Sequence, residues 1–201
     1  MLISLERALS NLGLTLWQRW TIGAVLGGIL VYCLADHFYH VKTGVLIYHW
    51  QPLVDGQSIW VWPIFILAAF FMVLIAYPFT NGCSAPSLKS IIFNFLWTHV
   101  IYFSSGIFGN AYLTGFTIVM IILWLFRLTF IHEYRIRIII LSITLSLITG
   151  SLEGLFSYFG LFDYQVQQVF RVPFWLFAAY LHAGFFVFSA TRWIRTGKFS
   201  S

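Results

Sequence analysis

Long apolar runs separated by short polar segments make up most of the chain. Six of them cover residues 20–37, 59–79, 90–109, 111–130, 137–161 and 171–191. Each approaches the roughly 20 residues that a helix needs to cross the hydrocarbon of a bilayer. The pattern predicts an all-α fold: a polytopic bundle of six transmembrane helices in one domain over 20–195, with a cytoplasmic tail over 196–201.

The division between the third and fourth runs rests on weak signals. Small and polar residues interrupt the apolar pattern there, but none of them is charged. They are Ser104, Ser105, Gly106, Gly109 and Asn110. A bundle of five helices, one of them broken, is therefore the alternative.

Residues 1–19 show a different period. Leucines at 2, 5, 9, 12 and 16 alternate in steps of three and four, which places them on one face of an amphipathic helix. The segment lacks the apolar core and the cleavage site of a signal peptide. We expect an interfacial helix on the headgroups that ends near Trp17, Arg19 and Trp20.

Composition agrees with a membrane location. Of the 201 residues, 60% are hydrophobic and only 8% are charged, whereas soluble domains carry roughly 25% charged residues. No basic run alternates with aromatic residues, so nucleic acid is not an expected partner. Cys33 and Cys83 lie in different environments, so no disulfide framework is implied.

The basic residues predict the orientation. In the six-helix arrangement nine fall on one side and two on the other, Lys42 and Arg171. The nine are Arg7, Arg19, Lys89, Arg127, Arg135, Arg137, Arg192, Arg195 and Lys198. The positive-inside rule then puts both termini in the cytoplasm. Compact loops and the lack of a cleavable signal favour a bacterial inner membrane, and the endoplasmic reticulum is the eukaryotic equivalent.

Glu153 is the most costly residue in the apolar runs. It lies roughly 15 Å below the predicted outer end of the fifth helix, by helix rise, where a carboxylate costs a few kcal/mol. His182 lies at a similar depth, and His99 is roughly 14 Å from the inner end of the third helix. These three ionisable side chains therefore predict one intramembrane polar cluster.

The cluster has two interpretations. In the first it lines a lipid-accessible cavity, in which Glu153 and His182 bind a ligand hydroxyl or, in an enzyme, act as catalytic residues. Further candidate ligand-binding residues are His99, Asn94, Ser157 and Trp175. In the second, a buried Glu–His hydrogen bond only fixes helix packing.

A second group of polar residues surrounds the outer end of the first run. It comprises Asp36, His37, His40, His49 and Asp55. The helical spacing of its first three members could ligate Zn²⁺. A wet helix end at the interface explains the same residues more simply, so no metal and no cofactor is expected.

The layout resembles the Insig (insulin-induced gene) family of six-span membrane proteins in its bacterial type. Trp60-Val61-Trp62-Pro63 is similar to that family's Trp-Trp-Val-Pro-Pro. The segment 160–164 resembles its Gly-Val-Tyr-Gln-Tyr, 171–173 its Arg-Ser-Trp-Leu-Pro, and Arg192 its basic exit. The resemblance implies a cavity between helices that binds a sterol or another lipid, and regulation of a membrane partner.

Two features depart from that family. Its acidic residue after the third span has no counterpart in 106–110, which puts a sterol-sensor partner in doubt. Glu153 is not a family feature either. Glu153, followed by Gly and Tyr and then by Val172-Pro173 and Trp175, instead resembles carotenoid hydratases and cyclases over about 25 residues.

Three functions follow. The first, which is preferred, is a non-enzymatic membrane protein that binds a lipid or sterol-like ligand. The second is an intramembrane enzyme on an isoprenoid or other hydrophobic substrate, with Glu153 as general acid; a single carboxylate with two histidines is a weak basis for catalysis. The third is a structural subunit of a membrane complex, and it ranks above the enzyme. Expected partners are membrane lipid and another membrane protein.

Overall fold

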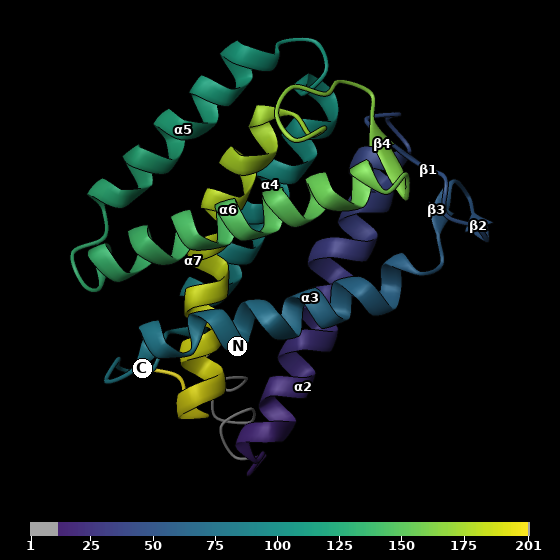
Figure 1. Ribbon diagram of the computed structural model, residues 1–201. Helices are drawn as coiled ribbons and strands as arrows, with labels where there is room; N and C mark the ends of the chain where they lie inside the picture. The colour runs from purple at the N-terminus through teal and green to yellow at the C-terminus, as the bar shows by residue number, and fades with distance from the viewer. Residues whose placement is uncertain (1–11, 201) are drawn as a thin grey trace.

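The structure, a computed structural model, describes residues 12–200. Six α-helices account for most of them (Figure 1): α2 (Leu16–Leu26), α3 (Val61–Ala76), α4 (Leu88–Phe108), α5 (Leu113–Thr129), α6 (Arg135–Tyr158) and α7 (Phe174–Thr196). The first of them continues through two π-helical segments, η1 (Gly27–Leu34) and η2 (His37–Val41). A short 3-10 helix, η3 (Pro78–Thr80), follows α3.

Every predicted apolar run forms a helix. Four helices are long and apolar enough to cross a membrane, namely Leu16–Val41, α4, α6 and α7. The other two, α3 and α5, are apolar but have only 16 and 17 residues. Six complete crossings therefore stay a prediction. The third and fourth runs are separate helices, so the alternative with one broken helix is wrong.

The first long helix begins earlier than predicted. Thr15 caps it in a capping box, in which the Thr15 side chain accepts from the Gln18 backbone and the Gln18 side chain accepts from the Thr15 backbone. Trp17 and Arg19 thus belong to α2, and the predicted boundary at residues 19–20 is too late. The rest of the predicted interfacial helix, residues 1–11, lies outside the described residues.

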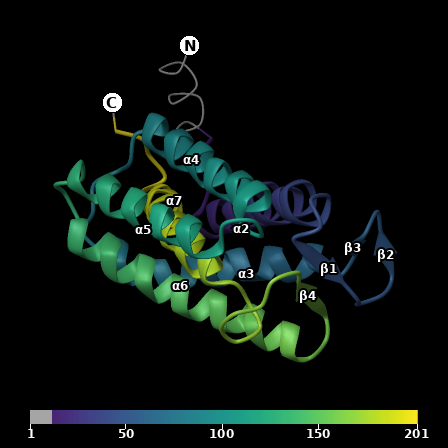
Figure 2. The ribbon, with the colours of Figure 1, turned by 90° about the horizontal axis from the view of Figure 1, so that it is seen from above.

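The C-terminal helix α7 forms the centre of the bundle. In the most apolar 18-residue stretch of α7, 72% is buried inside the bundle, whereas the corresponding share is 28% in α4 and 39% in α6. Viewed from above, it lies among the other helices (Figure 2). Small residues permit this packing: a Cβ added to Gly184 would lie 2.2 Å from the Ser142 Oγ of α6.

Short strands, which the all-α prediction lacks, join two loops at one end of the bundle. Strand β1 (Leu46–Tyr48) pairs antiparallel with β4 (Phe162–Tyr164), so the loop after the first helix is joined to the loop between α6 and α7. A smaller pair is formed by β2 (Leu53–Val54) and β3 (Gln57–Ser58). Pairing of two or three residues leaves almost no periodic signal in a sequence.

At the other end of the bundle, arginines satisfy the backbone of the α3–α4 loop. Arg137 donates to the carbonyl oxygens of Phe79 and Asn81, and Arg192 donates to that of Ser84. Arg195 of α7 donates to the carbonyl oxygen of Tyr77. Several of the charges that predict orientation therefore also hold a loop in place.

Candidate functional site

Glu153 is buried in the bundle, as predicted, but its partners are tyrosines. Tyr164 of β4 donates a hydrogen bond to one carboxyl oxygen, and Tyr180 of α7 donates to the other. Burial and then the carboxyl of Glu153 raise the pKa of Tyr164 well above its usual range, so this hydroxyl stays protonated. The predicted pairing of Glu153 with a histidine is wrong.

His182 is engaged elsewhere. Its Nδ1 accepts a hydrogen bond of 3.1 Å from the Trp97 indole, and its Nε2 lies 2.9 Å from the carbonyl oxygen of Met120. Both ring nitrogens are thus occupied on the side of α7 that faces α4 and α5. The residue two positions before it, Tyr180, faces Glu153 instead.

His99 joins neither group. Its ring packs on Phe95 of the same helix, with centroids 4.4 Å apart, and on Tyr39 at 6.1 Å. Its Nε2 is buried and has no hydrogen-bond partner among residues 12–200. The structure therefore separates the three ionisable residues that depth alone had grouped.

Ser157 and Trp175 lie near the acid. The Ser157 hydroxyl donates to Asp163 at 3.5 Å, one residue before the Tyr164 that binds Glu153. The Trp175 ring is fully buried against Tyr164, with centroids 5.9 Å apart. These two candidates therefore support the β4 segment that carries one donor to the carboxyl.

Asn94 belongs to another cluster, around Arg127. Its side-chain oxygen accepts a hydrogen bond of 2.6 Å from the guanidinium of Arg127. The sequence interpretation counted Arg127 only among the nine basic residues of the cytoplasmic side. It lies in the last turn of α5 and is buried, with 9% of its surface exposed.

The outer Asp/His residues form separate pairs. His37 lies 3.2 Å from Asp55, and His49 lies 3.0 Å from Asp163. His40 lies 3.6 Å from Asp36, whose other oxygen accepts hydrogen bonds from Tyr48 and Gln57. Within residues 12–200 no group of three such side chains could hold a metal ion.

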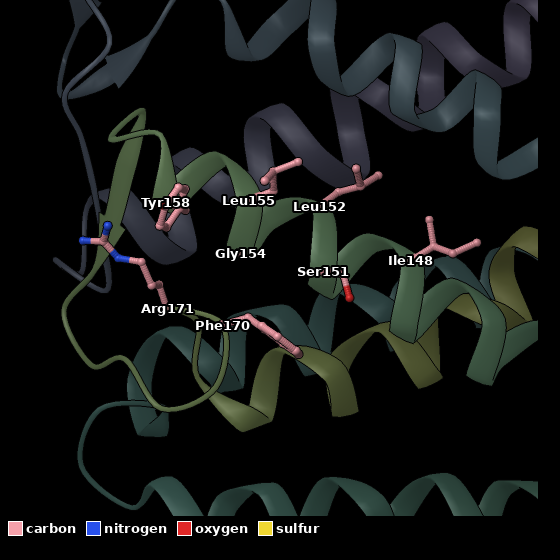
Figure 3. Close-up of a pocket in the computed structure, with 8 residues that line it drawn as sticks. All are labelled: Ile148, Ser151, Leu152, Gly154, Leu155, Tyr158, Phe170 and Arg171. Atoms are coloured by element: carbon pink, nitrogen blue, oxygen red, sulfur yellow. The ribbon is translucent and has the colours of Figure 1, made fainter.

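An apolar groove runs along α6 on the surface behind Glu153. It has a volume of about 530 Å³ and extends from Ile148 to Arg171 (Figure 3). The remaining lining residues are Ser151, Leu152, Gly154, Leu155, Tyr158 and Phe170. Gly154 allows the loop before α7 to close one side, because a Cβ there would lie 2.4 Å from the carbonyl oxygen of Phe170.

The loop that borders this groove has unusual backbone geometry. Phe170 and Arg171 have φ angles of 48° and 62°. These lie in the left-handed region, which residues other than glycine rarely adopt. Strained residues of this kind gather at functional sites. The groove therefore combines an open apolar surface with a strained edge formed by Phe170 and Arg171.

Comparison with known proteins shows the fold. No protein-family model matches the sequence, and no curated protein does. The structure is similar to a mycobacterial Insig homologue, MvINS from Mycobacterium vanbaalenii, with a TM-score of 0.74 and 15% identity over 87% of this chain and 92% of that chain. The chain has an Insig-like fold. A cross-linked trimer of an MvINS variant matches with a TM-score of 0.73 and 15% identity, over 88% and 94%.

The Insig-like fold and the apolar helices make this chain an integral membrane protein. The resemblance inferred from the loop motifs is thus confirmed for the fold. At 15% identity it concerns the backbone, so the roles of individual side chains have to be argued from this chain's own contacts. The Insig-like fold itself assigns none of them.

Three contacting residues escaped the sequence analysis: Arg127, Tyr164 and Tyr180. Arg127 lies inside the run 111–130, three residues before its end. A charged residue inside an apolar run was the signal that could have predicted its burial. Tyr164 entered the sequence analysis only within the segment 160–164, and nothing there marks it as a partner of Glu153. Tyr180 stands in an apolar run with no distinguishing neighbour, so its contact with Glu153 follows only from the packing of α6 on α7.

Proposed function

We propose that this membrane protein binds a lipid or sterol-like molecule in the groove between α6 and the loop before α7. The observation that carries the proposal is the groove itself: about 530 Å³ of apolar space, which is the usual size of a small-molecule site. Its side chains are exposed, including Leu152, Leu155 and Phe170. On a membrane-facing surface an open apolar groove suits an acyl chain or a sterol ring system.

Arg171 supplies the polar end in this proposal. It is exposed at one end of the groove, and its guanidinium lies 3.4 Å from a carboxylate oxygen of Asp163. A ligand hydroxyl or ester oxygen could accept a hydrogen bond from the same side chain, because guanidinium has five N–H donors. The ligand would then lie along α6 with its polar end toward the outer loop.

Glu153 has a positioning role in this proposal. Both of its carboxyl oxygens accept from tyrosines, so it does not point into the groove. It holds α6 to α7 through Tyr180 and to β4 through Tyr164. The adjacent Gly154 forms part of the groove wall, so the carboxyl keeps that wall in place.

The same proposal includes orientation and location. Both termini face the cytoplasm, because the basic residues gather at that end of the bundle. A bacterial inner membrane is the proposed location, supported by the likeness to a mycobacterial protein. Six helices cross the bilayer, the two shorter ones included.

Lipid retention tests the function. Protein purified in mild detergent should release a co-purified lipid on extraction and mass spectrometry. Ser151→Phe fills the groove from an exposed position and should lose that lipid, whereas Leu147→Phe, on the same helix but outside the groove, should retain it. Equal retention by both variants would rule out the groove as the lipid site.

A further inference from the structure

Arg127 is a buried cation without a counter-ion among residues 12–200. It lies in the last turn of α5 and only 9% of its surface is exposed. The ion pairs of the described residues involve Asp36, Asp55 and Asp163, and none of them includes Arg127. A charge removed from water without an opposite charge is costly, so this position calls for an explanation.

The contacts of Arg127 within residues 12–200 leave a buried nitrogen, Nη1, without a hydrogen bond. Nη2 donates to Asn94 at 2.6 Å, and the guanidinium carbon lies 4.0 Å from the centre of the Phe185 ring and 5.1 Å from that of Trp97. Nη1 is buried and has no hydrogen-bond partner among the described residues. The faces of these rings attract the positive charge, but they do not provide the hydrogen-bond acceptor that Nη1 lacks in the described part of the chain.

The surrounding side chains hold the guanidinium in place. The Asn94 amide nitrogen donates to Ser189 at 3.3 Å, which fixes the oxygen that accepts from Arg127. The Trp97 indole donates to His182, which fixes the ring beside the cation. Asn94 and His182, both predicted as ligand-binding residues, therefore help to orient Arg127, the first directly and the second through Trp97. A fixed guanidinium with a buried nitrogen that is unpaired in the described fold suits an oxyanion.

Phe93 covers this site on the membrane side. The Phe93 ring lies 5.8 Å from the guanidinium carbon, and Phe93 is 56% exposed on the outer surface of α4. Arg127 is two residues from the end of α5, about 3 Å by helix rise. It therefore lies in the half of the bundle on the side of the α5–α6 turn, which faces one leaflet.

We infer that Arg127 binds the phosphate of an anionic phospholipid, which reaches Nη1 from this leaflet when the exposed Phe93 side chain turns aside. The phosphate oxygens accept from Nη1, and the acyl chains lie along the apolar surfaces of α4 and α5. This site is at the opposite end of the bundle from the α6 groove, so its failure and that of the proposed function are separable. The bound lipid supplies the negative charge that the described part of the chain lacks there.

The test compares lipid selectivity among matched variants. The purified protein in detergent is titrated with phosphatidylglycerol or phosphatidylcholine, and binding is read by native mass spectrometry and thermal unfolding. Arg127→Gln should reduce the preference for phosphatidylglycerol by about tenfold or more, the usual loss of a charged hydrogen bond. Lys89→Gln removes the same charge from an exposed position of α4 and should keep the preference.

Other arms separate the alternatives. Arg127→Lys keeps the charge but removes the planar guanidinium, so it should give an intermediate preference for phosphatidylglycerol. This variant replaces Arg127→Gln in the test if Arg127→Gln does not fold. If Arg127→Gln lowers the unfolding temperature but retains the full shift with phosphatidylglycerol, Arg127 is structural and the inference is wrong. Inorganic phosphate should produce no shift, and an Arg127-dependent shift with phosphate alone would overturn the lipid source. Stronger phosphatidylglycerol binding by Glu6→Gln would identify Glu6, outside the described residues, as the counter-ion and overturn it too.

Discussion

Tyr180 of α7 donates a hydrogen bond to Glu153 of α6, so a carboxyl group joins the two helices that pack most extensively in this bundle. Tyr164 of β4 binds the other carboxyl oxygen from the outer loop. One acidic side chain therefore fixes three segments, and its substitutions should reveal whether its role is positioning or chemistry.

Glu153→Gln should fold and retain most of its lipid, because an amide can still accept one tyrosine hydroxyl and donate to the other. Glu153→Leu should lower stability by about 2–6 kcal/mol, since it leaves two buried hydroxyls unpaired at about 1–3 kcal/mol each. Thermal unfolding in detergent measures both. If Glu153→Leu were as stable as the wild type, the Glu153 carboxyl would not contribute to the packing of these segments.

Removing the hydroxyls as well should repair that loss. In Glu153→Leu combined with Tyr164→Phe and Tyr180→Phe, no polar atom of this cluster is left unpaired, and apolar replacements of buried polar groups are often neutral. The triple variant should therefore unfold at a higher temperature than Glu153→Leu alone. Additive losses instead would mean that each tyrosine has a further partner.

Gly184→Ala should destabilise the bundle by about 1–3 kcal/mol, the typical cost of overpacking. The added Cβ would lie 2.2 Å from the Ser142 Oγ and 2.8 Å from its Cα, so the backbones of α6 and α7 would have to separate. Gly115→Ala on α5 is the control, because nothing lies within 4 Å of its Cβ position. Equal unfolding temperatures for the two variants would contradict this packing.

Reporter fusions test the orientation. A fusion after Lys42 should report the outer side and one after Arg137 the cytoplasm, because the basic residues favour the side that holds Arg137. The same location for both fusions would exclude the arrangement with six crossings. A fusion after Lys198 should agree with the one after Arg137.

The sequence was sufficient for the helices and for the burial of Glu153, since length, apolarity and depth decide both. It was not sufficient to predict which side chains contact one another inside the bundle. His182 and Tyr180 are two residues apart, and only the rotation of α7 determines that Tyr180 faces α6 while His182 faces Trp97. Arg127 was correctly placed inside the run 111–130, but its burial beside Asn94 depends on how α5 packs on α4 and α7, which the run alone does not determine.

The pairing of β1 with β4 has a consequence for how the chain is made. Leu46 follows the first helix, but its strand partner Tyr164 is synthesised only after α6. The ribosome has to deliver α3 to α6 and β4 before the strand after the first helix acquires its pairing. Until then β1 lacks the partner that it has in the described fold, and a chain stalled before residue 162 would leave this strand open to proteases.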